Sequence, residues 1–360
     1  MSTDFRNPGI TRRKLLQTGG AICVTVTALS RHAWAAEEEK IVNVYNWPTY
    51  IGEETIPSFE EATGIAVRYD LFGSNAELIG KLQAGNPGYD CVVASDFAVD
   101  LLKKQGLIVP LDHDKIPNIA HLDPAQANPI FDPGRKFSLP HAISTIGIGF
   151  RKTEISRDDA GTWGIFFDNN VLPGKKAHYD GARLTIGLTL QYLGYSANTT
   201  EQKEINEARD VLVAANKGLL TYAPDSGQDL LAAGTAHAVV EWSGDILQVM
   251  REDEELDYVV PKEGGLAWGD HWCIPKDAPH PNNAHKWINF VHDPEVQAEI
   301  MNTIRYGTGN LAAKEFINQE DVNNPVIYPP AEVWEKAEPI IDVGDANRFY
   351  DDAWTVIRSA

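Results

Sequence analysis

The fold is decided by residues 41–106, which read IVNVYNWPTYIGEETIPSFEEATGIAVRYDLFGSNAELIGKLQAGNPGYDCVVASDFAVDLLKKQG. Strand-like runs alternate there with helix-like stretches, the strands at 41–45, 66–71 and 91–94 and the helices at 53–63, 76–83 and 97–105. Gly64 and Gly106 directly follow a helix, and Gly85 lies close behind one, the usual place for a helix to stop. Short strands that alternate with helices of about ten residues predict a parallel α/β sheet.

A second α/β block is predicted from about Phe150 onward. Strands are expected at 236–241 and 257–260, and helices at 184–192, 201–215, 283–291 and 294–303. The tail from 311 to 360 is predicted to be mostly helical, with a break at Pro329 and Pro330. The chain of 360 residues exceeds a single core and contains no Ser/Gly-rich linker, so we expect two domains with several chain crossings between them.

Residues 1–36 are predicted to be a twin-arginine signal peptide rather than part of the fold. The stretch TRRKLLQ at 11–17 carries the paired arginines, and a weakly apolar stretch and the small-x-small triplet AWA at 33–35 follow it. The apolar stretch is too short to span a bilayer. We therefore expect export to the periplasm; the alternative is a lipid anchor at Cys23, which the bulky Ile22 before it disfavours.

The chain is strongly acidic, with a formal net charge of −20. Loss of the basic signal peptide would make the mature chain more acidic still. Such a charge disfavours nucleic acid and anionic membrane surfaces as partners, and it attracts small cations. The alternative is that the charge serves only solubility.

Two short phrases, WSGD at 242–245 and WGD at 268–270, each place an indole within three residues of a carboxylate, and Trp47 and Tyr50 form a third aromatic cluster. An aromatic face attracts a cation, and a neighbouring carboxylate adds a charge-assisted hydrogen bond to an ammonium group. For each phrase alone, the alternative is a core tryptophan beside a solvated turn. The first phrase and the third cluster, however, directly follow predicted strands, where open α/β sheets bind ligands. Together the clusters predict a cleft that holds an organic amine.

The chain resembles the spermidine/putrescine-binding proteins of ABC importers over nearly all of its mature length. The motifs that carry the resemblance are YNWPTY at 45–50, YDCVVAS at 89–95, LGYSANTT at 193–200, PKEGG at 261–265 and NLAA at 310–313. The resemblance implies a two-lobed periplasmic binding protein fold, α/β in class, with the ligand in the cleft between lobes joined by crossover strands. It implies a first lobe of residues 37–146 plus 268–314 and a second of residues 147–267 plus 315–360. The implied partners are a polyamine or diamine and the permease subunits in the inner membrane, and the protein is expected to be a monomer.

The resemblance also implies which residues contact the ligand. They are Trp47, Tyr50, Ser95, Phe97, Trp242, Asp245, Trp268, Asp270 and Tyr306. In the family, the rings at 242 and 268 sandwich the methylene chain, and the acid at 270 pairs with one terminal ammonium. Asp245 matches an acid of the putrescine-type members. No catalytic residue, metal site or cofactor is implied.

Three positions depart from the family pattern. Leu184 stands where the family usually has a Glu that binds an amine, Gly181 where spermidine-type members often have an Asp, and Ile340 where such members have a Gln. With these polar contacts missing, the expected ligand is putrescine or a similar short diamine. Asp180 would compensate if the local register slipped by one residue.

An exported enzyme is the main alternative from another class, and the sequence disfavours it because the common metalloprotease, CxxC, nucleophile-elbow, phosphate-loop and dinucleotide motifs are missing. His271 beside Asp270 is expected to be a structural hydrogen-bonder. A second alternative keeps the fold but binds a quaternary amine, an opine or an amino acid derivative. A metal ion would need clustered ligands, and none stands out in the sequence. Cys91 and Cys273, in apolar runs, are expected to be free.

Overall fold

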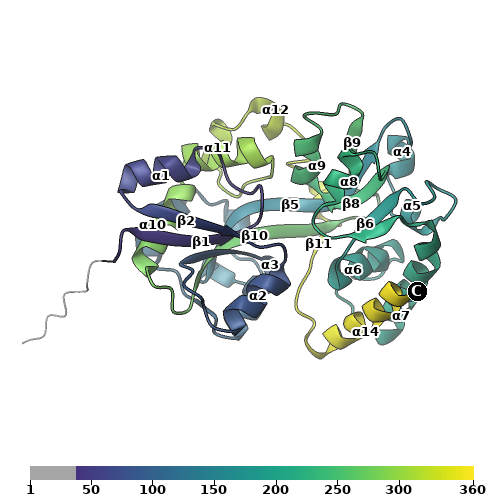
Figure 1. Cartoon of the computed structure of the whole chain (residues 1–360), viewed down its shortest axis with the longest axis horizontal. Coiled ribbons are helices and arrows are strands. Elements are labelled where there is room, and N and C mark those ends of the chain that lie inside the picture. Colours follow the sequence, from purple (N-terminus) through teal and green to yellow (C-terminus); the bar gives the residue numbers. More distant parts are fainter. Residues whose placement is uncertain (1–37) are drawn as a thin grey trace, which may run out of the picture. The chain divides into compact units, whose positions relative to one another are not determined.

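A mixed β-sheet runs through the part of the chain that this computed structural model describes, residues 38–360 (Figure 1). It has eleven strands there, and eight of them follow the order β2-β1-β3-β10-β5-β8-β6-β7. Of the other three, β4 and β11 pair with β10, and β9 pairs with β5. The predicted signal peptide at 1–36, with its twin arginines and its cleavage site, lies outside the described residues.

The strands are β1 (Ile41–Asn46), β2 (Ala66–Leu71), β3 (Cys91–Ser95), β4 (Ile108–Val109), β5 (Ser138–Arg151), β6 (Lys176–Tyr179), β7 (Thr221–Ala223), β8 (Ala238–Trp242), β9 (Leu256–Val259), β10 (Leu266–Pro275) and β11 (Glu338–Pro339). The α-helices are α1 (Thr55–Thr63), α2 (Asn75–Gln83), α3 (Asp96–Lys104), α4 (Arg157–Ala160), α5 (Gly164–Phe167), α6 (Ala182–Tyr192), α7 (Gln202–Ala215), α8 (Gly227–Ala232), α9 (Ser243–Val249), α10 (Pro281–Val291), α11 (Pro294–Ile304), α12 (Gln319–Val322), α13 (Ala331–Trp334) and α14 (Asn347–Ser359). Short 3-10 turns lie at His113–Lys115, Pro117–His121, Pro124–Gln126, Pro133–Arg135, Asn216–Gly218, Ala312–Glu315 and Gly344–Ala346.

The first half of the sheet confirms the alternation of strands and helices predicted for residues 41–106. Strands β1, β2 and β3 are parallel, with Val44 opposite Tyr69 on one side and Cys91 on the other. The helices α1, α2 and α3 begin and end within two residues of the predicted bounds. Helix α1 stops at Gly64, whose φ of 66° is left-handed, a conformation that glycine adopts without the strain that a side chain would cause.

The sheet is mixed rather than wholly parallel, which corrects the sequence-based prediction. β10 runs antiparallel to both β3 and β5. β5 is 14 residues long; residues 138–145 pair with β10, and residues 146–151 pair with β8 and β9. Figure 1 shows β5 and β10 crossing from the first half of the sheet to the second. These strands are chain crossings of the kind expected, while the exact lobe limits remain a prediction.

Helices cover both faces of each half of the sheet, so the predicted α/β class is confirmed (Figure 1). In the first half, α1 and α11 lie on one side and α2 and α3 on the other. In the second half, α8 and α9 lie on one side and α6, α7 and α14 on the other. Trp163, Trp272 and Trp287 are fully buried in the core, so for these three indoles core packing is the role.

The tail is less helical than predicted. Between 311 and 346 it forms short helical turns and the two-residue strand β11, and the first long helix, α14, begins at Asn347. Proline removes a backbone N–H and breaks helices, which explains the difference. The prolines of this segment are Pro325, Pro329, Pro330 and Pro339.

Three further features bear on location and partners. Cys91 and Cys273 are fully buried and free, as predicted.

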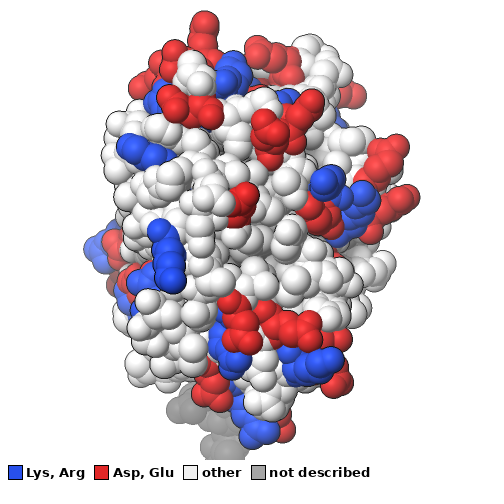
Figure 2. Space-filling model, turned by 90° about the vertical axis from the view of Figure 1, so that its right-hand side faces the viewer, with Lys and Arg blue, Asp and Glu red and all other residues white. Residues whose placement is uncertain are grey.

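None of the helices between residues 38 and 360 is both long and apolar enough to cross a membrane. On the face shown in Figure 2, acidic and basic side chains are interspersed around a broad uncharged area, and the basic ones form no continuous patch. This face therefore offers no basic surface of the kind that nucleic acid requires.

Candidate binding site

A cavity of about 540 Å³ brings together residues from both halves of the sheet. Eight of the nine predicted contact residues line it, namely Trp47, Tyr50, Phe97, Trp242, Asp245, Trp268, Asp270 and Tyr306. Residues 47–50 follow β1, Phe97 lies in the first turn of α3, and residues 242–245 join β8 to α9. The cavity thus lies where strands end and helices begin, which is where open α/β sheets bind ligands.

Gly244, in the WSGD phrase, permits a close approach between two segments of the cavity wall. A Cβ atom at this position would overlap the ring of Tyr306. The Tyr306 hydroxyl lies close enough to donate a hydrogen bond of 2.9 Å to Oδ2 of Asp245. The phrase therefore joins the start of α9 to the segment that follows α11.

Asp270 lies at one end of the cavity, and neutral hydroxyl groups bind both of its oxygens. Tyr50 Oη donates to Oδ2 at 2.9 Å, and Ser95 Oγ donates to Oδ1 at 2.7 Å. Burial raises the pKa of Asp270 to about 6, and the hydrogen bonds from Ser95 and Tyr50 act in the opposite direction. The carboxylate is fixed in place and retains its charge at neutral pH. We call this group, Asp270 with Tyr50 and Ser95, the Asp270 end.

Ser95 is the one predicted contact residue that does not line the cavity. It is fully buried at the end of β3, where Asn75 Nδ2 donates to its Oγ at 2.9 Å. Its hydroxyl group donates to Asp270 and does not face the cavity. In this structure Ser95 therefore orients an acid of the site, which differs from the direct contact that the resemblance implied.

The rings of Trp242 and Trp268 form an aromatic corner rather than a sandwich. Their centroids are 4.8 Å apart and their planes are inclined by 44°. A methylene chain between two rings would need them about 7–8 Å apart, twice the optimal carbon–carbon separation. The predicted sandwich is therefore absent in this conformation, and a chain would pack along the corner. Phe97 extends the corner, with its ring centroid 5.9 Å from that of Trp268.

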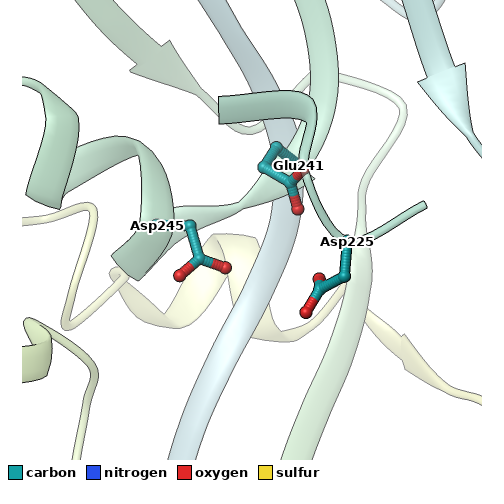
Figure 3. A group of neighbouring side chains, drawn as sticks. All are labelled: Asp225, Glu241 and Asp245. Atoms are coloured by element: carbon teal, nitrogen blue, oxygen red, sulfur yellow. The ribbon is translucent and has the colours of Figure 1, made fainter. Parts of the chain in front are cut away.

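Three acids, Asp225, Glu241 and Asp245, lie at the other end of the cavity, and we call them the acid cluster (Figure 3). Asp225 and Asp245 line the cavity, and Glu241 is fully buried behind them. One oxygen from each lies within 4.8 Å of the others. Asp225 comes from the loop between β7 and α8, Glu241 from β8, and Asp245 from α9. Trp242 Nε1 donates to Oδ1 of Asp225 at 3.1 Å, so the cluster also orients one ring of the aromatic corner.

Burial and mutual repulsion raise the pKa of every acid in the cluster. Burial, followed by repulsion from Asp225, raises the pKa of Asp245 to about 8. Burial and then repulsion from Asp270 raise the pKa of Asp225 to about 6. Burial, followed by repulsion from Asp225, places the pKa of Glu241 well above its ordinary value. Since like charges at this spacing resist joint ionisation, the cluster retains protons near neutral pH unless a cation enters.

The described part of the chain provides no basic side chain to neutralise these acids. Arg183 is the only lysine or arginine among the residues that line the cavity. Its guanidinium donates to Ile341 O, Asn347 Oδ1 and Asn198 Oδ1 and lies over the ring of Tyr350. The cavity thus combines an aromatic corner with uncompensated acids, an arrangement that attracts an external cation.

Sequence reasoning missed Asp225 and Glu241. Asp225 stands in the triplet Pro224-Asp225-Ser226, which has the composition of an ordinary surface turn. Glu241 had a usable signal, because a Glu within the apolar strand run AVVEW is placed for burial. Asp225 does not stand next to an aromatic residue that would mark it as part of the cleft. Glu241 does, because it directly precedes Trp242.

The acid cluster also corrects the expectation that metal-ligating residues are not clustered. The three acids offer oxygens close enough together for one ion. Glu241, however, already accepts from Gly227 N at Oε2 and from Trp242 N at Oε1. Only Asp225 and Asp245 remain to face the cavity, and calcium takes six to eight oxygen ligands. The donor set therefore suits an ammonium group better than a calcium ion.

The three positions that depart from the family pattern all line the cavity. Leu184 and Ile340 are buried there, and Gly181 lies beside them in the wall. Asp180 lines the cavity as well, but its Oδ2 lies 3.6 Å from Arg358 Nη2, so a cation of the protein shares it. This part of the wall is accordingly apolar.

His271 has the structural role expected of it. It is buried, bonded through Nε2 to Asp96 and through Nδ1 to Arg135, and it does not line the cavity. Burial lowers its pKa well below the ordinary value. It therefore supports β10 from behind Asp270.

Comparison with known proteins relates most of the chain to one family. The family described as bacterial extracellular solute-binding protein matches residues 54–330. The spermidine/putrescine-binding periplasmic protein of Salmonella typhimurium is 32% identical, over 92% of this chain and 95% of that protein. The putrescine-binding periplasmic protein SpuD of Pseudomonas aeruginosa is also 32% identical, over 90% of this chain and 93% of that protein. A solved structure, a putative spermidine/putrescine ABC transporter from Listeria monocytogenes, superposes with a TM-score of 0.84 at 33% identity, over 89% of this chain and 99% of that one.

Proposed function

We propose, from the premise that this chain belongs to the family of bacterial extracellular solute-binding proteins, that it captures a polyamine and delivers it to the permease of an ABC importer. Its relatives are named as polyamine-binding periplasmic proteins, and the similar solved structure is named as an ABC transporter, so the chain is a binding protein and not an enzyme. One observation carries the choice of ligand. The cavity has carboxylates at both of its ends, an aromatic corner between them and no free basic side chain from residues 38–360.

A diamine matches these features group by group. Its methylenes pack along Trp242 and Trp268, and each buried CH₂ contributes about 0.8 kcal/mol. One ammonium group pairs with Asp270 and the other with Asp245, through charge-assisted hydrogen bonds. Trp47, Tyr50, Phe97 and Tyr306 complete the wall, and Ser95 acts through Asp270.

Two observations favour a short diamine such as putrescine over spermidine. The carboxylates of Asp270 and Asp245 are each bound by a tyrosine hydroxyl, and the rings of Tyr50 and Tyr306 are in contact, with centroids 5.2 Å apart. The two ends are therefore close together. The third nitrogen of spermidine would meet the apolar wall at Leu184, where an unpaired donor costs about 1–3 kcal/mol.

The proposal includes the way the protein acts in the cell. Two lobes, residues 37–146 plus 268–314 and residues 147–267 plus 315–360, close around one ligand, with β5 and β10 as the crossing strands. The protein acts as a monomer, and it acts in the periplasm, the location that the names of its relatives give for those proteins. It reaches the periplasm through the twin-arginine signal at 1–36.

A thermal-shift screen followed by calorimetry tests the proposal. Ligands that bind only the folded state raise the unfolding temperature. We expect putrescine to give the largest rise, spermidine a smaller one, and choline a small one because its quaternary nitrogen has no N–H to donate. Sugars and acidic amino acids are expected to give none. A sugar or an acidic amino acid at the top of the ranking would contradict the proposal.

A further inference from the structure

We infer that Asp225 is a ligand contact that determines specificity, pairing with Asp245 to hold one ammonium group of the ligand. The inference rests on the proposed function and adds to it a residue from an element outside the predicted site. The loop between β7 and α8 would thus supply an acid that the wall at Leu184 lacks. We call Asp225, Asp245 and Gln228 together the ammonium seat.

Position is the first support for this assignment. Asp225 and Asp245 both line the cavity, and Figure 3 shows their carboxylates as neighbours, with one oxygen of each within 4.8 Å of the other. Leu184 lines the same cavity, so the apolar position and the acid Asp225 contribute to the same binding site. The seat therefore lies within reach of a ligand that also contacts the aromatic corner.

Glu241 holds the Asp225 loop in place from behind. Its two oxygens accept from the backbone N–H groups of Gly227 at 2.8 Å and Trp242 at 3.0 Å. These bonds tie the start of α8 to the end of β8. A Cβ atom at Gly227 would be 2.5 Å from Glu241 Oε2, so the close approach depends on glycine. Asp225, two residues earlier, is thereby fixed beside Trp242.

The unused hydrogen-bond acceptors of the ammonium seat match an ammonium group. Oδ1 of Asp225 accepts from Trp242 Nε1, which leaves its Oδ2 without a partner among residues 38–360. Gln228 lines the cavity, and its Oε1 is buried without a hydrogen-bond partner in that same range. Asp245 has one oxygen bound by Tyr306 and the other free. A primary ammonium group has three N–H donors, one for each of these three acceptors.

The charges of Asp225 and Asp245 also favour a cationic nitrogen at the ammonium seat. Two aspartates face each other here, and no basic side chain of the described residues approaches them. A ligand nitrogen that brings a positive charge relieves their repulsion. A neutral hydroxyl group in the same place would leave the repulsion unchanged. The seat therefore selects a cationic nitrogen that carries N–H groups.

Calorimetry with putrescine on the full mature chain tests the inference, and Asp225→Asn is the variant of choice. The asparagine carbonyl still accepts from Trp242 Nε1, so the aromatic corner is retained while one charge is lost. We expect the affinity for putrescine to fall roughly 10- to 100-fold, the range for losing a hydrogen bond to a charged group. Asp158→Asn, an exposed charge in α4 that does not line the cavity, is the matched control and is expected to change affinity less than about threefold.

A second variant covers the case in which Asp225→Asn does not fold. Gln228→Leu removes the unpartnered acceptor without changing charge, and we expect a three- to tenfold loss, the lower part of the range for a single hydrogen bond. Near-normal putrescine affinity in both folded variants, while Asp270→Asn abolishes binding, would overturn the inference and leave the proposed function intact. Binding of Ca²⁺ in place of putrescine, lost in Asp225→Asn, would overturn the inference in favour of a metal site. A wild-type chain that binds neither polyamine would overturn the proposed function, and the inference with it.

Discussion

The two ends of the cavity hold acids in contrasting ways. At the Asp270 end, two hydroxyl groups from outside β10 bind the carboxylate, and it remains charged at neutral pH. At the other end, Asp225, Glu241 and Asp245 crowd together, and their mutual repulsion adds to burial in raising their pKa values. At the Asp270 end, the carboxylate is oriented and charged before the ligand arrives. At the other end, Asp225 has a pKa like that of Asp270, whereas Asp245 and Glu241 retain protons at neutral pH until a cation is present.

This difference separates two tasks in binding an amine. A preorganised carboxylate contributes affinity, because no reorganisation is needed when the ammonium group arrives. A crowded cluster contributes discrimination, because only a cation with N–H groups relieves the repulsion and satisfies the free acceptors.

The largest expected effect is that of Asp270→Asn. The variant keeps the shape of the side chain but leaves a desolvated ammonium group without its counter-ion, which costs about 3–5 kcal/mol of binding free energy. Asp245→Asn is expected to cost less, because Asp225 remains beside it. Calorimetry with putrescine measures both, with Asp352→Asn on the exposed face of α14 as the control. Equal losses at positions 245 and 270 would show that the ends do not differ.

The pH dependence of putrescine affinity is the next largest effect. The diammonium ligand pairs with ionised carboxylates, so it must displace any protons that they hold. Because the pKa of Asp245 is raised to about 8 and those of Asp225 and Asp270 to about 6, affinity should fall as pH falls through 8 and again through 6. Each displaced proton changes affinity about tenfold per pH unit below the pKa of its group, so we expect a loss of about 100-fold between pH 8 and pH 6 and a further fall toward pH 5.

Calorimetry across that pH range measures the effect, and Asp245→Asn is the control. The variant should lose the dependence between pH 7 and pH 8 and retain the dependence near pH 6. A wild-type affinity that is constant, or that rises toward pH 5, would show that the acids of the cluster do not pair with the ligand.

The aromatic corner gives a smaller effect that involves both ends. Truncation of Trp242 or Trp268 to Ala should weaken binding by about 1–3 kcal/mol, as for a buried aromatic anchor. Phe substitutions separate packing from hydrogen bonding, because Trp242 donates to Asp225 and Trp268 also bonds to Asp270. Each Phe variant should therefore lose less than the Ala variant at the same position, but more than the loss of ring area alone would cause. Unchanged binding in both Ala variants, with normal folding, would mean that the ligand lies elsewhere.

The smallest expected effect concerns the apolar wall. Leu184→Glu places an acceptor where the third nitrogen of spermidine would lie, so the affinity for spermidine relative to putrescine should rise by about 1–2 kcal/mol. Leu184→Gln is the matched control, with similar shape and no charge, and its change should be smaller. Competition calorimetry decides the ratio. A wild-type preference for spermidine, or no relative gain in the Glu variant, would show that position 184 does not limit the ligand.

Much of the fold could be predicted because its signals are local. The strand–helix alternation of residues 41–106 depends on short apolar runs and on helix stops such as Gly64, which neighbouring residues determine. The antiparallel direction of β10 could not be predicted in this way, since it depends on partners more than 100 residues away. The tail was mispredicted for a local reason, because the effect of its prolines was underestimated.

The site divides along the same line. The WSGD and WGD phrases and residues 47–50 were predicted because each carries its aromatic and polar groups close together in the sequence. Asp225 was missed because its partners, Trp242 and Asp245, lie 17 and 20 positions later, and only the packing of α8 against β8 brings them together. The contact between the rings of Trp242 and Trp268 likewise depends on the pairing of β5 with both β8 and β10.

One titration tests most directly the claim that the cavity holds two cationic groups at two different acidic ends. Putrescine and 1-aminobutane have the same chain length and differ by one ammonium group. We predict that putrescine binds with a stoichiometry of one and that 1-aminobutane binds roughly 100-fold more weakly or worse, since one end is left with an unpaired charge. Equal affinities for the two amines, or no binding of putrescine, would contradict the account.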